Sequence, residues 1–285
     1  MNSFQKAKDL LYISDLDGTL LQPNGTFSTE STQRLNHLIE EGMKFTIATA
    51  RNYDSANPIL EGLNLKLPAV LFNGVYLADF HNGKILEHTP FIDKIVVDSM
   101  LTLAQAQDIE PFIYTFGEEH QVYYRHATNP GSIAYLASLE KDGRVKHTPE
   151  FIFQEDENVA GFLLIGTMEN LEPIHHCLQE KHFDHLNLYF AEDVSMKGYY
   201  WLQAFHQQAN KGNMVEKLVD RLNFPLNKTM VFGDYLNDLD MFQVAGYSVA
   251  MENALPEVKE SADQIIGPNS QGAVLNFLES IWMNA

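Results

Sequence analysis

Short apolar runs alternate with amphipathic segments at the start of the chain. Residues 10–14, Leu-Leu-Tyr-Ile-Ser, have the length and composition of a buried strand. A polar stretch then leads to Ser28 or Thr29, either of which can cap a helix, and the residues after them place apolar side chains at helical spacing. Gly42 is the kind of residue that ends such a helix. This segment therefore predicts one strand followed by one helix.

The same alternation continues to residue 72. Apolar runs at 45–48 and 69–72 predict two more buried strands, and the segment between them predicts a helix through Ile59 and Leu63. Residues 75–79 and 84–86 flank the turn-forming sequence His-Asn-Gly and predict a hairpin. Strands separated by helices favour a doubly wound, Rossmann-like parallel sheet with helices on both faces.

The pattern changes near residue 89, where neighbouring strands begin to follow one another without a helix, as in an antiparallel α+β module. The strand–helix alternation resumes near residue 205. We therefore predict an α/β core domain of residues 1–87 and 205–285, with an inserted α+β domain of residues 88–204. The elements predicted after residue 89 are helices near 95–103, 133–139, 171–178, 211–222, 239–244 and 273–282, a short helix after Pro256, and strands near 111–116, 121–125, 161–165, 186–190, 199–204, 229–232, 248–251 and 263–266.

Composition and charge exclude several classes of partner. The chain has 285 residues, 45% of them hydrophobic and 20% charged, which is typical of a globular protein and long enough for two domains. A formal net charge of −19 disfavours nucleic acid and anionic membranes as partners. The single cysteine, Cys177, rules out an internal disulfide, and residues 1–9 show no apolar signal core. We expect a cytoplasmic protein.

Two carboxylates, Asp15 and Asp17, directly follow the first predicted strand. Side chains two residues apart share a face of an extended strand, so both emerge side by side, which favours a nearby metal ion. One can attack an electrophile while the other moves a proton. An EF-hand loop is excluded, because its sixth and twelfth positions would hold Leu20 and Thr26. By themselves these residues are compatible with an ordinary turn or with a catalytic phosphoryl-transfer site.

Residues suited to phosphate chemistry also follow other predicted strands. Ligands of an open parallel sheet bind beyond the carboxyl ends of the strands, so we expect Asp15, Thr49 and Asp234 to meet there. Asp15 and Asp234 offer hard oxygen ligands suited to Mg²⁺. Lys211, at a predicted helix start, adds a positive charge where the helix dipole also favours anions. Together, Mg²⁺ and Lys211 would admit a phosphate dianion despite the negative net charge.

Four motifs, in this order along the chain, resemble those of haloacid-dehalogenase-like phosphatases. They are Asp15-Leu-Asp-Gly-Thr, Thr49-Ala-Arg51, Lys211-Gly212 and Gly233-Asp234-x-x-Asn237-Asp238. Asn73-Gly74 and residues 248–254 are similar to the Cof-type subfamily, whose large α/β cap matches the predicted insertion. One departure is Ala50, where Cof-type sequences usually carry Gly; it adds a methyl group to the phosphate loop but keeps the backbone donor.

The resemblance implies a role for each motif residue. Asp15 would be the nucleophile that forms an aspartyl-phosphate, and Asp17 would protonate the leaving alcohol and later activate water. Mg²⁺ would be bound by Asp15, Asp234 and the backbone carbonyl of Asp17, while Asp238 would steady the metal shell or Lys211. The phosphate would be held by the backbone N–H of Leu16 and by Thr49, Ala50, Lys211 and Asn237. Asn73 would be a supporting residue; for Arg51, contact with phosphate or substrate and a surface ion pair are both open.

The activity implied is Mg²⁺-dependent hydrolysis of a small phosphorylated metabolite, such as a sugar phosphate, a nucleotide or a phosphorylated cofactor. The cap would close over the site, exclude water and select the leaving group. A phosphotransferase or mutase that uses the same intermediate, and a non-catalytic phosphate-binding regulator, are open alternatives. Both a monomer and a homodimer fit the sequence. Dinucleotide-binding, P-loop and serine-hydrolase motifs do not occur.

Two further groups of residues in the insertion have chemical potential. Histidines gather near Cys177, although their spacing fits no tight structural zinc pattern. Aromatic residues in the predicted strands can either pack in a core or stack on a substrate ring. The first group is His175, His176, Cys177, His182 and His185, and the second is Phe112, Tyr114, Tyr123, Tyr124, Tyr199, Tyr200 and Trp201.

Overall fold

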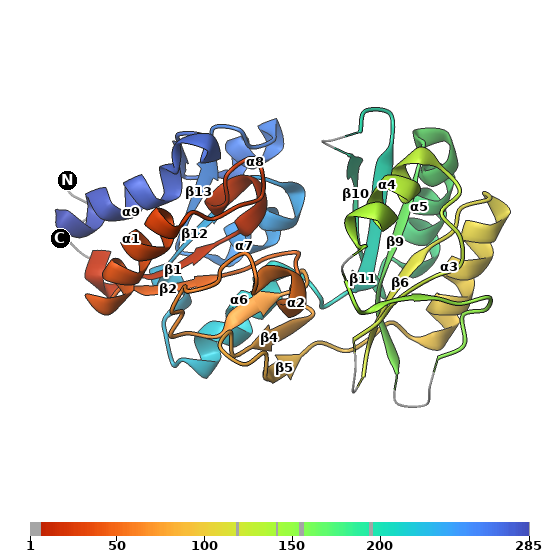
Figure 1. Ribbon diagram of the computed structural model, residues 1–285, viewed down its shortest axis with the longest axis horizontal. Coiled ribbons are helices and arrows are strands. Elements are labelled where there is room, and N and C mark those ends of the chain that lie inside the picture. Colours follow the sequence, from red (N-terminus) through yellow and green to blue (C-terminus); the bar gives the residue numbers. More distant parts are fainter. Residues whose placement is uncertain (1–6, 118–119, 141, 154–156, 194–195, 285) are drawn as a thin grey trace. The chain divides into compact units, whose positions relative to one another are not determined.

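The computed structural model describes residues 7–117, 120–140, 142–153, 157–193 and 196–284. Residues 1–6, part of the segment predicted to lack a signal core, lie outside these ranges. The chain forms two compact units, Met1–Thr89 with Ala209–Ala285, and Pro90–Gln208 (Figure 1). Within the described ranges, every helix is too short or too polar to cross a membrane.

Five parallel strands form the main sheet of the first unit. β1 is flanked by β12 and β2, with Ser14 opposite Phe232 on one side and Ile47 on the other. All positions of β1 are buried, which explains why this strand is apolar on both faces. The predicted doubly wound parallel sheet is confirmed. In spatial order the strands are β14 (Gln264–Ile266), β13 (Tyr247–Met251), β12 (Thr229–Gly233), β1 (Leu11–Ser14) and β2 (Lys44–Ile47).

Helices cover both faces of this sheet. Helices α1 (Thr29–Glu40) and α9 (Ala273–Met283) pack together on one face, whereas α6 (Lys211–Arg221), α7 (Leu239–Val244) and α8 (Pro256–Ser261) lie on the other (Figure 1). Ser28 caps α1 as predicted, since its hydroxyl accepts from the Ser31 N–H at 3.0 Å. Short 3₁₀ helices complete the unit at Ala7–Asp9, Leu226–Lys228, Leu236–Asp238 and Asn269–Gln271.

Two local predictions in the first unit differ from the structure in part. The strand predicted at 69–72 is β3 (Ala69–Leu71), which pairs antiparallel with β4 (Tyr76–Ala78) and meets the parallel sheet through an isolated bridge. The strand itself is found, but its expected place in the parallel sheet is not, because a tight turn after β3 sends the chain straight back into the antiparallel strand β4. The helix predicted through Ile59 is only α2 (Tyr53–Ala56), because Pro58 has no N–H to continue the helical hydrogen bonds. β5 (Ile85–His88) completes the predicted hairpin with β4.

The inserted unit is built on a six-stranded sheet. Its neighbouring strands are antiparallel except for the β7–β8 pair, and β8 is a short strand that the sequence pattern did not predict. The predicted α+β character is confirmed. The strands in spatial order are β10 (Leu186–Glu192), β11 (Tyr200–His206), β9 (Asn158–Gly166), β6 (Phe112–Phe116), β7 (Val122–Tyr124) and β8 (Val145–His147), and the helices are α3 (Lys94–Ala106), α4 (Pro130–Ser138) and α5 (Met168–His182).

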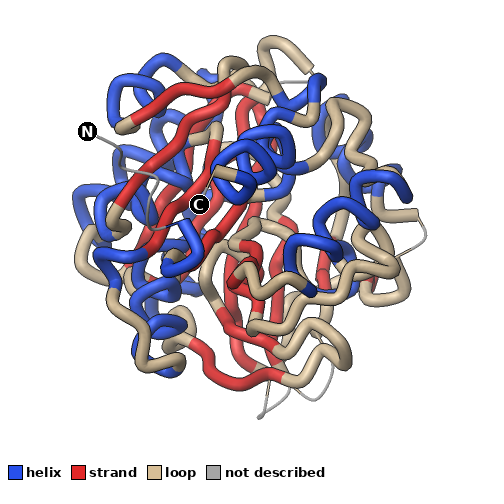
Figure 2. Tube along the Cα trace, turned by 90° about the vertical axis from the view of Figure 1, so that its left-hand side faces the viewer, coloured by secondary structure: helices blue, strands red, loops and turns tan. Residues whose placement is uncertain are grey.

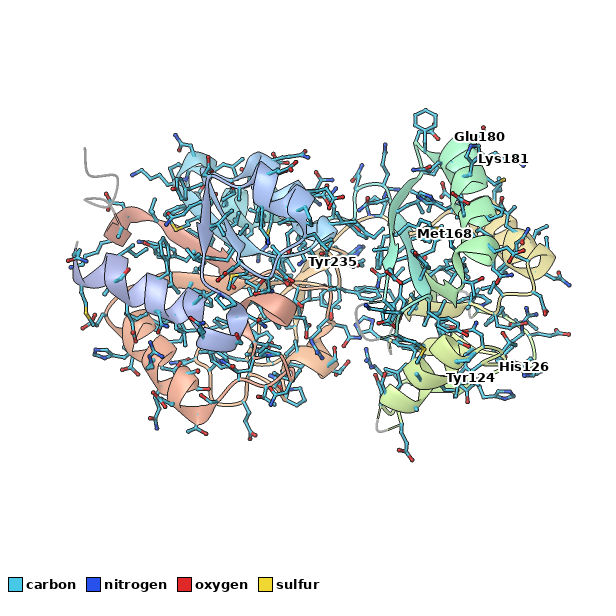
Figure 3. All side chains as sticks on the ribbon, turned by 90° about the horizontal axis from the view of Figure 1, so that it is seen from above. Tyr124, His126, Met168, Glu180, Lys181 and Tyr235 are labelled. Carbon is cyan, nitrogen blue, oxygen red and sulfur yellow. The ribbon has the colours of Figure 1, made fainter. Side chains whose placement is uncertain are left out.

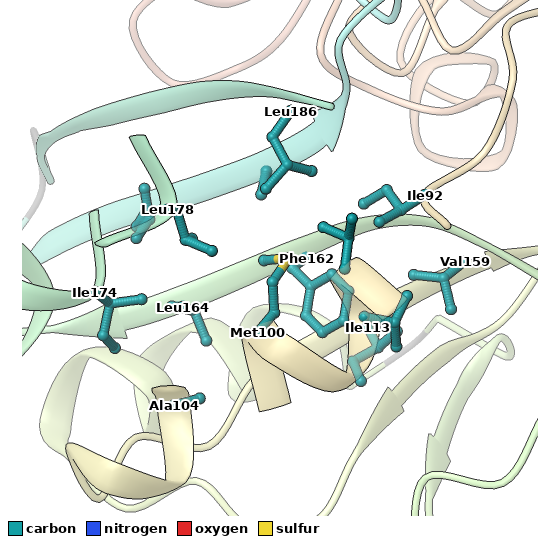
Figure 4. Close-up of a cluster of buried hydrophobic side chains, with 14 of the residues drawn as sticks. Ile92, Met100, Ala104, Ile113, Val159, Phe162, Leu164, Ile174, Leu178 and Leu186 are labelled. Atoms are coloured by element: carbon teal, nitrogen blue, oxygen red, sulfur yellow. The ribbon is translucent and has the colours of Figure 1, made fainter. Parts of the chain in front are cut away.

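Alternation along β9 divides the core of this unit between the two faces of its sheet. Phe162 and Leu164 pack with side chains of α3 and α5, among them Met100 (Figure 4). Leu163 and Ile165 point to the opposite face, where they form a cluster with aromatic side chains. Figure 2 shows the strands of both units in red, with helices beside them.

The aromatic residues of the inserted unit mostly serve this packing. Phe112 is fully buried and packs edge-on against Tyr135, whose ring also meets Trp201. Tyr114 and Tyr135 share a hydrogen bond between their hydroxyls at 2.5 Å. Of the two uses predicted for the strand aromatics, the structure supports core packing for these residues.

Candidate active site

The carboxyl ends of three parallel strands bring the predicted motif residues to one edge of the sheet. Asp15 directly follows β1, and its N–H donates to the carbonyl of Phe232 in β12 at 2.9 Å. On the other side of β1, the Ala48 N–H donates to the Ser14 carbonyl at 2.9 Å. Thr49 and Asp234 therefore begin their loops beside Asp15. The register of the sheet is what assembles residues far apart in the sequence.

Lys211 lies at the centre of this edge. It is the first residue of α6, whose N-cap is Asn210, and its side chain is fully buried. Its Nζ donates to Asp15 Oδ1 at 2.7 Å and to Asp238 Oδ1 at 2.6 Å. Burial by itself would lower the pKa of Lys211, but the charges of the two carboxylates outweigh it and raise that pKa, so the ammonium stays charged. The predicted meeting of Asp15, Lys211 and Asp238 is found.

Three carboxylates surround the ammonium group. Oxygen atoms of Asp15, Asp234 and Asp238 lie within 4.8 Å of one another. Burial, together with the neighbouring carboxylates, raises the pKa of Asp15 well above its ordinary value even though Lys211 opposes the shift. Burial and the charge of Asp238 raise the pKa of Asp234 to about 7. The cluster is therefore short of positive charge.

This donor set fits a hard divalent cation such as Mg²⁺. Three carboxylates and one ammonium carry a formal charge of −3 + 1 = −2, which one such ion would neutralise. Both oxygens of Asp238 already accept hydrogen bonds. Oδ1 accepts from Lys211, and Oδ2 accepts from the N–H groups of Asp234 at 2.8 Å and Tyr235 at 3.0 Å (Tyr235 is labelled in Figure 3). Within the described ranges, Oδ2 of Asp15 and Oδ2 of Asp234 accept no hydrogen bond, so the metal would be held by these two residues.

Gly18 makes room for the Asp234 carboxylate. Its φ is +75°, and a Cβ atom at this position would lie 2.1 Å from Asp234 Oδ2. The turn of residues 16–20 is closed by the Leu21 N–H, which donates to the Leu16 carbonyl at 2.9 Å. Only glycine combines this backbone conformation with so close an approach. The glycine of the first motif therefore has a spatial role next to the predicted metal site.

The Asp17 carboxylate is paired with Arg51 and is not part of the carboxylate cluster. Its two oxygens accept from Arg51, from Nε at 2.7 Å and from Nη2 at 2.8 Å, and the side chain is 50% exposed. Of the alternatives left open for Arg51, the structure contains the ion pair. Asp17 does not belong to the carboxylate cluster, and the metal contact predicted for its backbone carbonyl stays a prediction.

Thr49 is connected to the same network. It is buried, its hydroxyl accepts from the Arg51 N–H at 3.1 Å, and its carbonyl accepts from the Asn73 N–H at 3.0 Å. Asn73 in turn binds Asn237, whose Nδ2 donates to Asn73 Oδ1 at 2.7 Å. Thr49, Asn73 and Asn237 are thus brought together. Leu16 and Ala50 neighbour Asp15 and Thr49 in the chain, and the phosphate contacts expected of their N–H groups stay predictions.

Two polar residues of the site were given no role from the sequence. Thr19 donates its hydroxyl to Asp234 Oδ1 at 2.8 Å, which orients the carboxylate. Asn253 donates to the Gly18 carbonyl at 2.8 Å and accepts from the Asn269 N–H at 2.9 Å, so it ties the loop after β13 to the first motif. Both residues lie inside motifs noted in the sequence. Their place in those motifs was the signal that could have identified them as site residues.

The histidines near Cys177 do not form a metal site. Among residues that the structure describes, Asp15, Asp234 and Asp238 are the one group of three or more His, Cys, Asp or Glu ligands close enough to share an ion. His182 instead contacts the Ser99 hydroxyl at 2.9 Å. The zinc hypothesis finds no support in the described part of the chain.

Known proteins resemble this chain over nearly its whole length. Residues 12–278 match the family described as haloacid dehalogenase-like hydrolase. A pyridoxal phosphate phosphatase of Escherichia coli is 28% identical over 281 residues, covering 93% of this chain and 96% of its own. An HMP-PP phosphatase of Serratia proteamaculans is also 28% identical over 281 residues, covering 95% and 94%.

Solved structures share the fold. A haloacid dehalogenase-like hydrolase from B. subtilis superposes with a TM-score of 0.77 at 23% identity, covering 94% of this chain and 98% of its own. Another, from Bacteroides thetaiotaomicron, has a TM-score of 0.76 at 23% identity, covering 95% and 99%. Because the family match spans nearly the whole chain and the motif residues gather at one edge of the parallel sheet, this protein belongs to the haloacid dehalogenase-like hydrolases.

Proposed function

We propose that this protein is a Mg²⁺-dependent phosphatase that hydrolyses phosphomonoesters of small metabolites. The observation that carries the proposal is the buried Lys211 bridging Asp15 and Asp238 next to Asp234. An ammonium group and a divalent cation on either side of one carboxylate would hold a phosphate dianion against that carboxylate. The single cysteine favours a reducing compartment, so the proposed setting is the cytoplasm.

In the first proposed step, one carboxylate oxygen of Asp15 would help to hold the metal, and its other oxygen attacks the phosphorus atom. A bond forms between this oxygen and phosphorus, and the bond from phosphorus to the leaving alcohol oxygen breaks. Asp17, in its protonated form, gives its proton to that oxygen. Lys211 offsets the charge that builds up on the phosphoryl oxygens.

In the second step, a water molecule attacks the phosphorus of the aspartyl-phosphate and the bond to Asp15 breaks. Asp17, now ionised, takes the proton from the water and is ready for the next cycle. Bound Mg²⁺ would supply positive charge beside the phosphoryl group. Since Arg51 occupies both oxygens of Asp17 in this structure, the proposal requires that Asp17 leave Arg51 in order to act as an acid.

The names of the relatives support one substrate class for first testing. They include phosphatases of pyridoxal phosphate, of HMP-PP and, in a B. subtilis relative, of 5-amino-6-(5-phospho-D-ribitylamino)uracil. These three relatives are named for different substrates and are only 28%, 28% and 24% identical to this chain. No single substrate can therefore be assigned to it from their names. We propose phosphorylated cofactors and their heterocyclic precursors as the substrate class, ahead of simple sugar phosphates and nucleotides.

The test is phosphate release from p-nitrophenyl phosphate and from a panel of phosphorylated metabolites, with and without Mg²⁺. Asp15→Asn should lower turnover by at least about 10³-fold, because the amide cannot act as the nucleophile. Asp220→Asn, an exposed position on α6, is the matched control and should keep wild-type turnover. Wild-type protein that releases no phosphate from any substrate, or Asp15→Asn within a few-fold of wild type, would refute the proposal. Transfer of the phosphoryl group to an added alcohol in place of water would identify a phosphotransferase.

A further inference from the structure

Three consecutive residues after β3 have left-handed backbone conformations. Phe72, Asn73 and Gly74 have φ angles of 54°, 52° and 80°. Residues other than glycine rarely adopt this conformation, and where they do the surrounding structure holds them in place, often beside a functional site. This turn contains two such residues in a row.

The turn is pressed against the start of α6. A Cβ atom on Gly74 would lie 2.1 Å from the carbonyl oxygen of Asn210 and 3.1 Å from the backbone nitrogen of Lys211. On the other side, the Phe72 N–H donates to the Arg51 carbonyl at 2.8 Å. The turn therefore lies between the loop that follows β2 and the residue that carries the buried ammonium group.

Asn73 is the residue through which this turn reaches the predicted phosphate-binding groups. It is 1% exposed. Its N–H donates to the Thr49 carbonyl at 3.0 Å, and its side-chain Oδ1 accepts from Asn237 Nδ2 at 2.7 Å. One buried residue thus joins two loops that are far apart in the sequence and that each supply a group expected to bind phosphate.

The NH₂ group at the other end of the Asn73 side-chain amide is a hydrogen-bond donor that this network does not use. Its Nδ2 is buried and has no hydrogen-bond partner among the residues that the structure describes. In this structure Asn73 Oδ1 faces the Asn237 amide, so the NH₂ group is the end of the Asn73 amide that lacks an acceptor among the described residues. Buried donors without acceptors are rare in folded proteins, and such a donor is available to a ligand oxygen or a water molecule. The surplus donor is an independent sign of an oxyanion site.

We propose that Asn73 is a positioning residue of the phosphate site, which holds the Asn237 amide ready to donate to a phosphate oxygen and keeps Thr49 and Lys211 in register. One N–H of the Asn237 amide is used by Asn73, and the second is left for the ligand. The inference rests on the proposed function only in taking phosphate as the ligand of this site.

Two substitutions separate the parts played by the backbone and the amide. Asn73→Gly keeps the left-handed conformation but removes the contact with Asn237. Asn73→Asp keeps the shape and the acceptor for Asn237, and it replaces the surplus donor with a carboxylate oxygen. The matched control is Asn223→Gly, at another left-handed asparagine (φ 49°) that follows α6 and takes no part in these contacts.

The experiment titrates inorganic phosphate into each protein by calorimetry in the presence of Mg²⁺ and measures kcat and KM with p-nitrophenyl phosphate. Asn73→Gly should raise the Kd for phosphate by about tenfold, the value of one good hydrogen bond, and Asn73→Asp should raise it further because it adds a negative charge. KM should rise by the same factor as Kd while kcat changes little, because the Asn237 amide that Asn73 positions would contact the phosphoryl group in the bound substrate and in the transition state alike. Asn223→Gly should behave like the wild type.

The inference is overturned if both Asn73 variants bind phosphate within twofold of wild type, if Asn223→Gly weakens binding as much as Asn73→Gly does, or if the wild type binds no phosphate. Failure of the proposed function looks different: the wild type would bind phosphate but hydrolyse no phosphomonoester. In that case the Kd values still decide the role of Asn73.

Discussion

The close approach between Gly18 and the Asp234 carboxylate provides a direct test of the metal site. We predict that Gly18→Ala displaces Asp234 and weakens Mg²⁺ binding. Gly25→Ala is a matched control, since its φ of +74° equals the +75° of Gly18 within a degree, but a Cβ there would lie no closer than 4.0 Å to the Arg51 Nη2 atom. The two substitutions therefore differ in the contact with Asp234.

The expected magnitudes follow from that difference. Each alanine costs about 1–2 kcal/mol of folding free energy for its left-handed backbone. Each also recovers about 0.4–1 kcal/mol, because alanine restricts the unfolded chain. Both contributions are shared by the pair. In Gly18→Ala the new Cβ would stand 2.1 Å from Asp234 Oδ2, so the carboxylate has to move and its hydrogen bond from Thr19 is strained.

Urea unfolding with and without Mg²⁺ measures both effects. With Mg²⁺ at 100 times the wild-type Kd, wild type and Gly25→Ala should gain about 2.7 kcal/mol from the ion. If the displaced Asp234 weakens binding by about 100-fold, Gly18→Ala should gain only about 0.4 kcal/mol. An equal gain in Gly18→Ala and Gly25→Ala would show that Asp234 does not hold the ion as inferred.

Three other substitutions test separate parts of the structure. Lys211→Met should lower the unfolding free energy by about 3–5 kcal/mol, because it leaves buried carboxylates without their cation, and it should abolish phosphate release; urea unfolding and the phosphatase assay check this. Arg34→Met should cost about 0.5–1 kcal/mol at pH 7 through loss of its paired hydrogen bonds with Glu279. Because Arg34 lowers the pKa of Glu279 below its ordinary value of 4.5, this contribution is present above that pH and should disappear as the pH falls below it, so unfolding of the two proteins should converge in acid. Phe162→Ala, in the core of the inserted unit, should cost about 3–5 kcal/mol in that unit while phosphate binding in the first unit persists; unfolding followed by tryptophan fluorescence of Trp201 would detect it.

Local patterns in the sequence were sufficient for most of the elements that carry the site. Leu11–Ser14 is apolar on both faces because both faces are covered, and Lys211 begins a helix behind the cap Asn210. The prediction departed from the structure where one or two residues overrode the pattern. Pro58 ends α2 after one turn. Phe72 and Asn73, both in left-handed conformations, reverse the direction of the chain after β3.

The sequence by itself determined which chemical groups are present and, through the strand ends of a parallel sheet, that Asp15, Thr49 and Asp234 share one edge. Only the tertiary structure decided how these groups pair. The Lys211 ammonium binds Asp15 from 196 positions away, and Asn73 binds Asn237 across 164 positions. Asp17 faces Arg51 rather than the carboxylate cluster. Such pairings depend on side-chain directions and sub-ångström packing between distant loops, and hydrophobic periodicity contains no information about either.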